Sequence, residues 1–381
     1  YAPALYDLTE LQRDGNKLYG FSAKETLNIM QRLYEQHKIL TYPRTDSRYL
    51  STDIVSTLKD RLKACGVGPY AAAALKLSIS PLQPSKNVVD NSKVSDHHAI
   101  IPTEQPVVLS ALSNEERKIY DLVVKRFLAV LLPPYEYEQT NLLAEIGGET
   151  FRAKGKIVKS AGWKDVYSSG GSLSDENDEE SEGDISLTDQ LLPELKKGQD
   201  IIIKSLVRSS GHTSPPPYFT EGTLLSAMEN PVKYMSEADR EMIKIIGEAG
   251  GIGTVATRAD IIEKLLGTFL IEKKGKSLHM TSKGRQLLEL VPAELKSPLL
   301  TAQWEKRLEQ ISKGTLKKDV FIGDMKAYSE KIVNEIKSST RTFKHDNVTR
   351  EKCPECGNFL LEVAGKKGKM LVCPDRECGH R

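Results

Sequence analysis

The sequence predicts a multidomain, mainly α-helical protein with a β-rich middle part and a small cysteine-containing module at its C-terminal end. Its 381 residues are enough for two to four domains with hydrophobic cores of their own. Helical periodicity dominates before residue 133 and after residue 215, whereas β-branched runs broken by glycines lie between them. Four of the five cysteines follow residue 352, which indicates a metal site in a reducing compartment and not a disulfide framework.

A helical domain is predicted for residues 1–132. Ser22 and Glu25 form a capping box that begins a helix, and this helix should end near Lys38. Another helix is expected to begin near Ser51. The chain between these two helices is therefore a connection, from which a side chain can project into a cleft.

The last helix of this domain begins at a second capping box, formed by Ser113 and Glu116, and should stop at the prolines 133–134. Residues 133–214 are then predicted to form a β-rich domain. Its expected strands are Leu142–Ile146, Thr150–Ala153, Lys156–Val158 and Ile201–Val207, with breaks at Gly147, Gly148 and Gly155.

An acidic segment at residues 168–186 interrupts the β-rich domain. It cannot bury enough apolar surface to order itself, so we expect a disordered, solubilising loop. Seven of the 52 acidic residues lie in it, which leaves 54 basic against 45 acidic residues elsewhere, a net charge of +9. That excess fits a polyanionic partner, and an ordinary solvated surface is the alternative.

Residues 215–337 are expected to form a second helical domain. Thr220 or Glu221 should begin one helix, and Thr257 should cap another, which a small hairpin follows near residues 269–280. The order helix, helix, hairpin is typical of a winged helix. Further helices are expected at 299–312 and 317–337, and a polar, basic linker at 338–350.

The heptad at residues 41–47, T-Y-P-R-T-D-S, is the first pattern that could carry chemistry. A phenol is a poor nucleophile at its ordinary pKa of about 10, but a nearby guanidinium can stabilise the phenolate or bind a phosphate. Pro43 disfavours the α conformation at Tyr42 and should hold it on a stiff, extended loop. Tyr42 and Arg44 are therefore candidates for attack on a phosphate, and an ordinary loop tyrosine is the alternative.

Two further patterns could serve a phosphate. His97, followed by His98, can donate a proton or a hydrogen bond to a phosphate oxygen, and a loop histidine or a zinc ligand are the alternatives. Four glycines within residues 247–254 precede Thr257 and would let a phosphate approach the backbone. Because this segment lacks the ending of a nucleotide-binding P-loop, a flexible turn is its alternative.

The C-terminal module has the spacing C-x2-C-x16-C-x4-C. Four thiolates make a closed, tetrahedral zinc site, so residues 351–381 are predicted to form a partial zinc ribbon with a structural Zn²⁺. Cys65 stands apart and is expected to be a buried, inert thiol. The predicted ligands are Cys353, Cys356, Cys373 and Cys378.

Five ordered motifs together resemble those of the type IA DNA topoisomerases, and of bacterial topoisomerase III in particular. This resemblance implies part of the toroidal fold of these enzymes. Residues 1–132 would bear the catalytic tyrosine, 133–214 would form the hinge and arch, and 215–337 would line a groove for single-stranded DNA. The motifs occupy residues 21–35, 41–47, 96–103, 215–231 and 251–262.

In that family the tyrosine of the Y-P-R-T-D-S motif attacks one DNA strand, so the resemblance assigns this role to Tyr42. Arg44 and His97 would act beside the scissile phosphate. The implied activity is ATP-independent relaxation or decatenation of DNA through a 5′-phosphotyrosyl intermediate. The DNA-binding residues that the resemblance implies are Arg44, Asp46, Ser47, His97, Thr257 and Arg258.

The family carries Mg²⁺ in an acidic Toprim domain, for which this sequence has no D-x-D-x-E pattern. We therefore expect a fragment that follows such a domain and does not complete the catalytic cycle alone. The resemblance also implies a monomeric bacterial protein of the cytoplasm and nucleoid that binds mainly single-stranded DNA. A helicase or a single-strand-binding protein is a candidate partner, and no membrane partner is expected, because no apolar run approaches the roughly 18 residues of a membrane span.

Two other functions remain as alternatives. A non-catalytic, single-stranded DNA-binding module with a zinc ribbon would use the basic surface and leave Tyr42 idle. A rolling-circle nickase would also form a phosphotyrosine, but that class typically needs two metal-binding histidines separated by one residue. His97 and His98 are adjacent and suit that pattern poorly.

Overall fold

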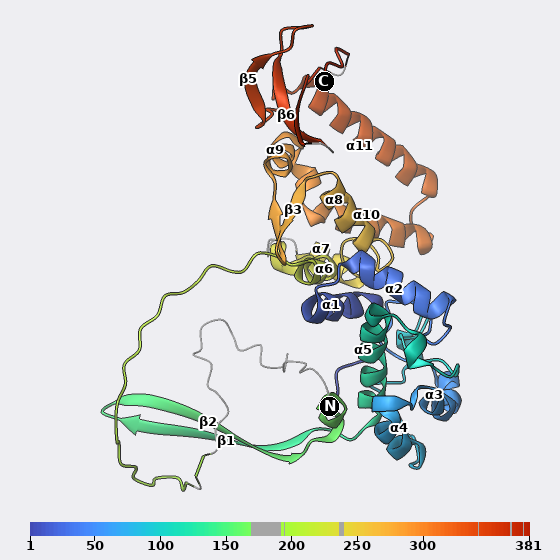
Figure 1. Ribbon diagram of the computed structural model, residues 1–381, viewed down its shortest axis with the longest axis vertical. Coiled ribbons are helices and arrows are strands. Elements are labelled where there is room, and N and C mark those ends of the chain that lie inside the picture. Colours follow the sequence, from blue (N-terminus) through green and yellow to red (C-terminus); the bar gives the residue numbers. More distant parts are fainter. Residues whose placement is uncertain (169–191, 194, 236–239, 342, 366–367, 376) are drawn as a thin grey trace. The chain divides into compact units, whose positions relative to one another are not determined.

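The computed structural model describes residues 1–168, 192–193, 195–235, 240–341, 343–365, 368–375 and 377–381 (Figure 1). These residues form two compact units, Tyr1–Pro217 and Tyr218–Arg381. The predicted domains 1–132 and 133–214 belong to the first unit, and their separation remains a prediction. The disordered loop predicted at 168–186 lies, apart from Ser168, outside the described residues.

Helix α5 is at the centre of the first unit, where α1, α2 and α4 contact it. Its buried face carries Ile119, Val123 and Phe127, which are fully shielded from solvent. These residues recur every four positions, as expected of a helix that buries one side. The helices of this part are α1 (Leu8–Tyr19), α2 (Ala23–Glu35), α3 (Leu58–Cys65), α4 (Ala71–Ser78) and α5 (Asn114–Leu131).

Both predicted capping boxes of the first unit are confirmed, at the starts of α2 and α5. The expected end of α2 near Lys38 is wrong, because the helix stops at Glu35. Lys38 adopts a positive φ of 58°, which a right-handed helix cannot contain. The helix expected near Ser51 begins instead as a 3-10 turn, Thr52–Thr57, that continues into α3.

A buried polar network fixes the N-terminal segment against the helical core. The Arg126 guanidinium donates to Asp14 at 2.9 Å, to the Tyr6 hydroxyl at 2.9 Å and to the Ala4 carbonyl at 3.0 Å, and Tyr6 itself donates to Asp14. Arg126 and Asp14 are both almost completely buried, so each charge needs the other as a partner. This network also sets the position of Tyr6, whose backbone bridges to Ile100.

Strands β1 (Glu136–Ile146) and β2 (Glu149–Ser160) form a long antiparallel hairpin that stands out in Figure 1. Gly147 and Gly148 make its turn with positive φ values of 61° and 87°, as predicted. The predicted break at Gly155 is wrong, because Gly155 pairs with Thr140 and the ladder of hydrogen bonds continues through it.

The strand predicted at Ile201–Val207 is also absent. The described part of the chain offers this segment no pairing partner, and its residues are exposed and belong to no helix or strand. The β propensity of a segment reflects its fit to a neighbouring strand, so without a neighbour the apolar pattern cannot form a ladder.

The second unit confirms the predicted hairpin, β3 (Ile271–Lys274) and β4 (Ser277–Met280), directly after α8. Thr220 caps its first helix through a capping box with Thr223. Two short helices, α7 and α9, were not predicted. The helices of this unit are α6 (Glu221–Glu229), α7 (Arg240–Glu248), α8 (Arg258–Gly267), α9 (Ser282–Leu290), α10 (Pro298–Ser312) and α11 (Lys318–Ser338).

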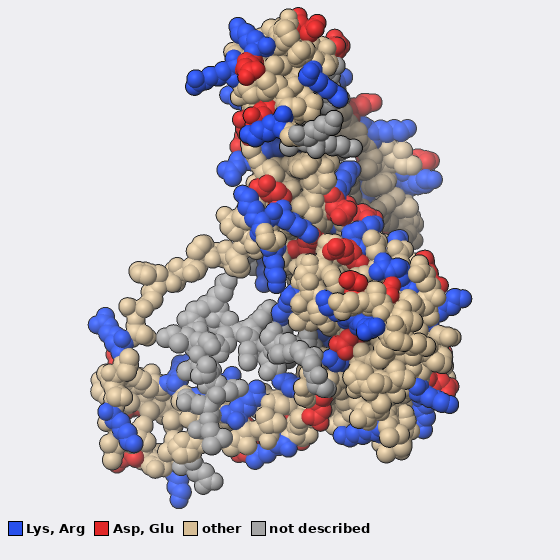
Figure 2. Space-filling view, in the orientation of Figure 1, with Lys and Arg blue, Asp and Glu red and all other residues tan. Residues whose placement is uncertain are grey.

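The second unit ends in a three-stranded antiparallel sheet of order β5-β6-β7. Its strands are β5 (Val348–Lys352), β6 (Phe359–Gly365) and β7 (Gly368–Val372). The predicted linker 338–350 therefore contains the first residues of this sheet. Over both units, Lys and Arg are mixed with Asp and Glu on the visible surface (Figure 2). None of the helices in the described ranges has the length and apolar character of a membrane span.

Candidate active site and metal centre

The heptad at residues 41–47 begins where the chain leaves a short antiparallel pairing. Leu40 forms a bridge with Pro102, and the Thr41 amide donates to the Ile101 carbonyl at 3.0 Å. The Thr41 hydroxyl bonds the same segment twice, donating to the Ala99 carbonyl at 3.2 Å and accepting from the Ile101 amide at 3.0 Å. Two sequence motifs that are far apart along the chain, 41–47 and 96–103, are thereby held side by side.

Buried hydroxyl groups hold the far end of the heptad. The Thr45 hydroxyl donates to the His97 carbonyl at 3.0 Å and accepts from the Ser47 amide at 3.1 Å. Ser47 is itself buried, and its hydroxyl donates to the Lys93 carbonyl at 2.8 Å. The Thr45 carbonyl accepts from the Leu8 amide at 3.1 Å, which ties the loop to the start of α1. The Ser47 hydroxyl thus already has partners inside the protein, and a DNA contact from it remains a prediction.

Aromatic contacts orient the side chain of Tyr42. The His97 ring stacks on it, with centroids 4.3 Å apart and planes inclined by 35°. The Tyr34 ring also contacts Tyr42, edge to face, with ring centroids 5.5 Å apart and planes inclined by 83°. His97 is exposed and Tyr42 is half-buried. The structure therefore brings together two of the three predicted catalytic residues as neighbours in contact.

Arg44 lies two residues beyond Tyr42, is half-buried, and makes no hydrogen bond or ion pair with any residue in the described ranges. The Tyr42 hydroxyl and the exposed Asp46 carboxylate likewise have no partner among the described residues. By contrast, Arg48 is fully engaged, with its guanidinium 2.6 Å from Asp7 and 3.2 Å from Glu10. The phenol of Tyr42, the guanidinium of Arg44 and the imidazole of His97 therefore remain available for a ligand, on the neighbouring segments 41–47 and 96–103.

The two adjacent histidines have different surroundings. His98 is half-buried, and its Nδ1 donates to the Ala99 carbonyl at 2.7 Å. Burial lowers the pKa of His98, which favours the neutral form of its ring. His97 faces solvent and Tyr42 instead, which supports the choice of His97 and gives the pair no shared ligand.

Thr257 and Arg258 lie in the second unit, at the start of α8. Thr257 occupies the predicted N-cap position of α8, but its side chain makes no capping hydrogen bond, because its hydroxyl accepts from the Thr254 amide at 2.9 Å instead. Arg258 is only 3% exposed, and its guanidinium donates to the carbonyls of Ile252, at 3.2 Å, and Gly250. Arg258 thus holds the glycine-rich segment, and DNA contacts from Thr257 and Arg258 remain predictions.

The glycine-rich segment packs against α6 at Gly251, where no larger residue fits. Gly251 has a φ of 89°, and a Cβ atom there would lie 2.2 Å from the Met228 carbonyl oxygen at the end of α6. The next residue, Ile252, donates its amide to that same carbonyl at 2.6 Å. Gly251 is therefore needed for close packing against α6. Neither a phosphate-binding loop nor a flexible turn would require a glycine for that reason.

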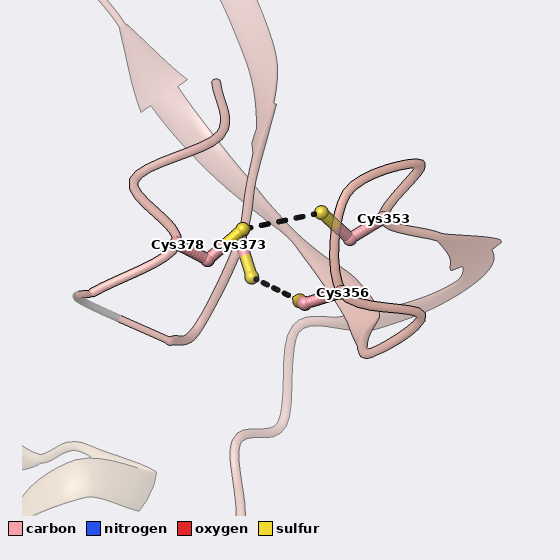
Figure 3. Close-up of side chains that lie close together, drawn as sticks. All are labelled: Cys353, Cys356, Cys373 and Cys378. Carbon is pink, nitrogen blue, oxygen red and sulfur yellow. Dashed lines mark hydrogen bonds between the residues drawn. The ribbon is translucent and has the colours of Figure 1, made fainter.

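The four C-terminal cysteines converge on one point, with all four sulfur atoms within 4.8 Å of one another (Figure 3). The Cys353 and Cys378 sulfurs are 3.6 Å apart, and those of Cys356 and Cys373 are 3.4 Å apart. A zinc ion with Zn–S bonds of about 2.3 Å in a tetrahedron needs sulfurs about 3.8 Å apart. The spacing fits, so these residues could hold a metal ion such as zinc.

Backbone geometry prepares Cys353 as a ligand. Its amide donates to the Asn358 carbonyl at 2.7 Å, and its carbonyl accepts from the Gly357 amide at 2.9 Å, closing a tight turn in which Gly357 has a φ of 76°. Burial opposes ionisation of the Cys353 thiol, but hydrogen bonds from the amides of Cys356 and Glu355 and from neighbouring thiols outweigh it and lower its pKa to about 7, whereas burial raises the pKa of Cys373 to about 12. Thiolate is the form that binds metals.

Sequence reasoning missed two residues that shape the tyrosine site. Tyr34 follows the fully buried Leu33 on α2, but it is 37% exposed and contacts Tyr42. Thr45 was not singled out although it fixes both Ser47 and the His97 backbone. A tyrosine at the edge of an apolar stripe was the available signal for the first, and for Thr45 the sequence offered none.

The model of a protein family described as DNA topoisomerase matches residues 1–323 of this chain. DNA topoisomerase 3 of Bacillus licheniformis and that of Bacillus subtilis are each 60% identical to it, and that of Bacillus cereus is 61% identical. Each match covers 100% of this chain and 51% of the relative, so the chain spans about half the length of the curated relatives it matches.

A solved structure of full-length topoisomerase I from Thermotoga maritima has a similar fold. It matches with a TM-score of 0.57 over 98% of this chain and 56% of that chain, at 21% sequence identity. The family match covers most of the sequence, and the resemblance drawn from the five motifs is confirmed. The chain therefore belongs to the DNA topoisomerase family.

Proposed function

We propose that this chain is the tyrosine-bearing part of a type IA DNA topoisomerase that relaxes or decatenates DNA without ATP. The observation that carries the proposal is the loop at 41–47, where the Tyr42 hydroxyl and the Arg44 guanidinium have no partner in the described residues and the His97 ring stacks on Tyr42. The relatives named DNA topoisomerase 3 support it over a non-catalytic DNA-binding module, which would leave this arrangement unused.

The proposed step exchanges one phosphoester for another. The Tyr42 oxygen attacks a backbone phosphorus atom and loses its proton, while the bond from phosphorus to the 3′ oxygen breaks and that oxygen gains a proton. The products are a 5′-phosphotyrosyl ester and a free 3′-hydroxyl. Because the new ester conserves the energy of the old bond, the reverse attack reseals the strand after another strand has passed.

Arg44 and His97 would act on the charge of the phosphate. A guanidinium can bind two phosphate oxygens at once and stabilise the charge that builds up during attack. The exposed His97 imidazole can donate a hydrogen bond to a third oxygen or shuttle a proton. Stacking keeps its ring against the phenol, so both groups would reach the same phosphate.

The family also implies Mg²⁺, and the residues present do not fit it. In the described part of the chain, the cysteine cluster is the only group of three or more metal-ligating side chains, and thiolates are poor ligands for Mg²⁺. We therefore assign no step to this ion. For Zn²⁺ the four cysteines do fit, and the ion would cross-link the ends of the β5–β7 sheet without taking part in the reaction.

The whole protein that contains this chain should trap single-stranded DNA covalently through Tyr42. We expect DNA labelled at its 3′ end to migrate with the protein on a denaturing gel in the presence of Mg²⁺, while DNA labelled at its 5′ end yields a shorter free strand. The variant Tyr42→Phe lacks the attacking oxygen and should give neither product.

The variant Tyr34→Phe is a suitable control, because it keeps the ring that contacts Tyr42 and should still trap DNA. Covalent product from Tyr42→Phe, or transfer of the 5′ label to the protein, would refute the proposed chemistry. For the whole protein, we also propose that it acts as a monomer and that a helicase assists the strand passage by which it unlinks DNA.

A further inference from the structure

The hairpin of β1 and β2 has one strongly basic face. Side chains of a strand alternate between its two faces, so Arg152, Lys154 and Lys156 share one of them. On the paired strand, Asn141 lies opposite Lys154 and Gln139 opposite Lys156. The Gln139 side chain donates to that of Asn141 at 3.1 Å, which places both on this same face. We call these five residues the basic face.

Two of the three cations of the basic face have no charged partner among the described residues. Arg152 and Lys154 make no ion pair or hydrogen bond there. The carboxylate on this face is that of Glu145, which lies near the turn, opposite Thr150 in the strand register. The opposite face differs, because its Lys159 is bound to Glu138 at 2.8 Å.

Aromatic rings continue the basic face at the base of the hairpin. Tyr135 and Tyr137 lie with ring centroids 5.4 Å apart, and the Lys156 ammonium is 4.8 Å from the Tyr137 centroid. The Lys164 ammonium lies 4.2 Å from the Tyr135 centroid. Tyr137 is exposed and Tyr135 is half-buried. Aromatic rings beside cations form the combination on which the bases of a single nucleic-acid strand stack.

The spacing of the cations also matches a nucleic acid. Same-face residues of an antiparallel strand are about 6.8 Å apart, since each residue rises about 3.4 Å. A DNA strand that runs along the hairpin can therefore place a phosphate beside each of the three cations, and Asn, Gln and Tyr side chains are common phosphate contacts as well.

We propose that the basic face of the β1–β2 hairpin binds the backbone of a DNA strand at a surface separate from the Tyr42 loop. The choice of DNA as the partner rests on the function proposed above. Because its contacts would be to phosphates and to ring faces of bases, this surface would hold DNA of any sequence and guide a strand without cleaving it.

The salt dependence of DNA binding tests this proposal. The variant R152Q/K154Q of the 381-residue chain should bind a fluorescent oligothymidine more weakly at low salt. The slope of log affinity against log salt should become shallower by about 1.4, that is about 0.7 for each phosphate of a single strand that the variant no longer neutralises. A matched control is K63Q/K76Q, which removes two positive charges from exposed sites on α3 and α4 of the same unit.

An unchanged slope in R152Q/K154Q, or an equal change in K63Q/K76Q, would overturn the proposal. A labelled polyglutamate peptide should not compete with the oligonucleotide, and equal competition would show a general anion-binding face instead. Circular dichroism would verify that both variants are folded. These binding measurements do not depend on cleavage, so the two proposals can fail separately. If the whole protein forms no covalent product but R152Q/K154Q has the shallower slope, only the Tyr42 chemistry is refuted. If the covalent product forms but the slope of R152Q/K154Q is unchanged, only the basic face is refuted.

Discussion

Side chains in the heptad at 41–47 divide into those that hold the loop and those left for a ligand. Thr45 and Ser47 are buried, and their hydroxyls are satisfied by backbone groups of the neighbouring segment. Tyr42 and Arg44 keep polar atoms that the described residues do not use. A buried hydroxyl without a partner would be costly, so this division also explains why small hydroxyl residues occupy the inward positions.

Arg44→Ala should separate catalysis from binding. We expect covalent trapping of DNA by the whole protein to slow by about 10²- to 10³-fold, the usual cost of removing a donor that stabilises developing charge. Affinity for the same oligonucleotide should fall by less than about tenfold, since Arg44 would be one of several phosphate contacts. Single-turnover trapping and fluorescence anisotropy measure the two effects.

Arg44→Lys is the informative comparison, because it keeps the charge but loses the two-pronged geometry of the guanidinium. We expect it to restore binding fully and trapping only in part. Equal losses of trapping and of affinity in Arg44→Ala would show that this residue merely helps to hold DNA.

Between elements, local signals predicted much of the structure but not the pairings that build the site. The capping boxes at Ser22 and Ser113 predicted the starts of two helices, because a cap depends on residues only three positions apart. The contact between the 41–47 and 96–103 segments depends on tertiary folding, which no local pattern specifies. The contacts of Arg258 with backbone carbonyls inside its own unit likewise depend on tertiary folding, and its DNA contact stays a prediction.

The cysteine cluster was predictable because ligand spacing is itself a local signal. We expect purified protein to contain about one zinc ion per chain by elemental analysis. Cys356→Ser should lose this metal, whereas Cys65→Ser should keep it, since Cys65 is buried in the first unit and burial raises the pKa of its thiol to about 12. A strong chelator should expose four additional thiols to a chromogenic reagent, and unchanged thiol reactivity after metal removal would contradict the site.

At the scale of the whole chain, the described residues form two compact units whose boundary falls at Pro217–Tyr218. Residues 201–217 before this boundary are exposed and belong to no helix or strand. The relatives are about twice as long as this chain, so complete strand passage is a property to be tested on the whole protein.

Limited digestion with trypsin should reveal this division. Early cuts are expected after the exposed residues Lys196, Lys197, Lys204 and Arg208, and they should leave an N-terminal fragment that contains Tyr42. Mass spectrometry of the first fragments would locate the cuts. The helices between residues 8 and 131 protect their backbone by hydrogen bonds, so cleavage there ahead of the 196–208 sites would contradict the division.

The stacking of His97 on Tyr42 has a consequence for the order in which this protein is made. The Thr41 hydroxyl and the Ala99 carbonyl are 58 residues apart in sequence, so the tyrosine leaves the ribosome several seconds before its partner segment at the usual rate of about 5–20 residues per second. Throughout that interval the nascent chain contains the complete heptad but no assembled site. The tyrosine to which we assign the attack on DNA thus reaches its proposed arrangement only once the fold around it has closed.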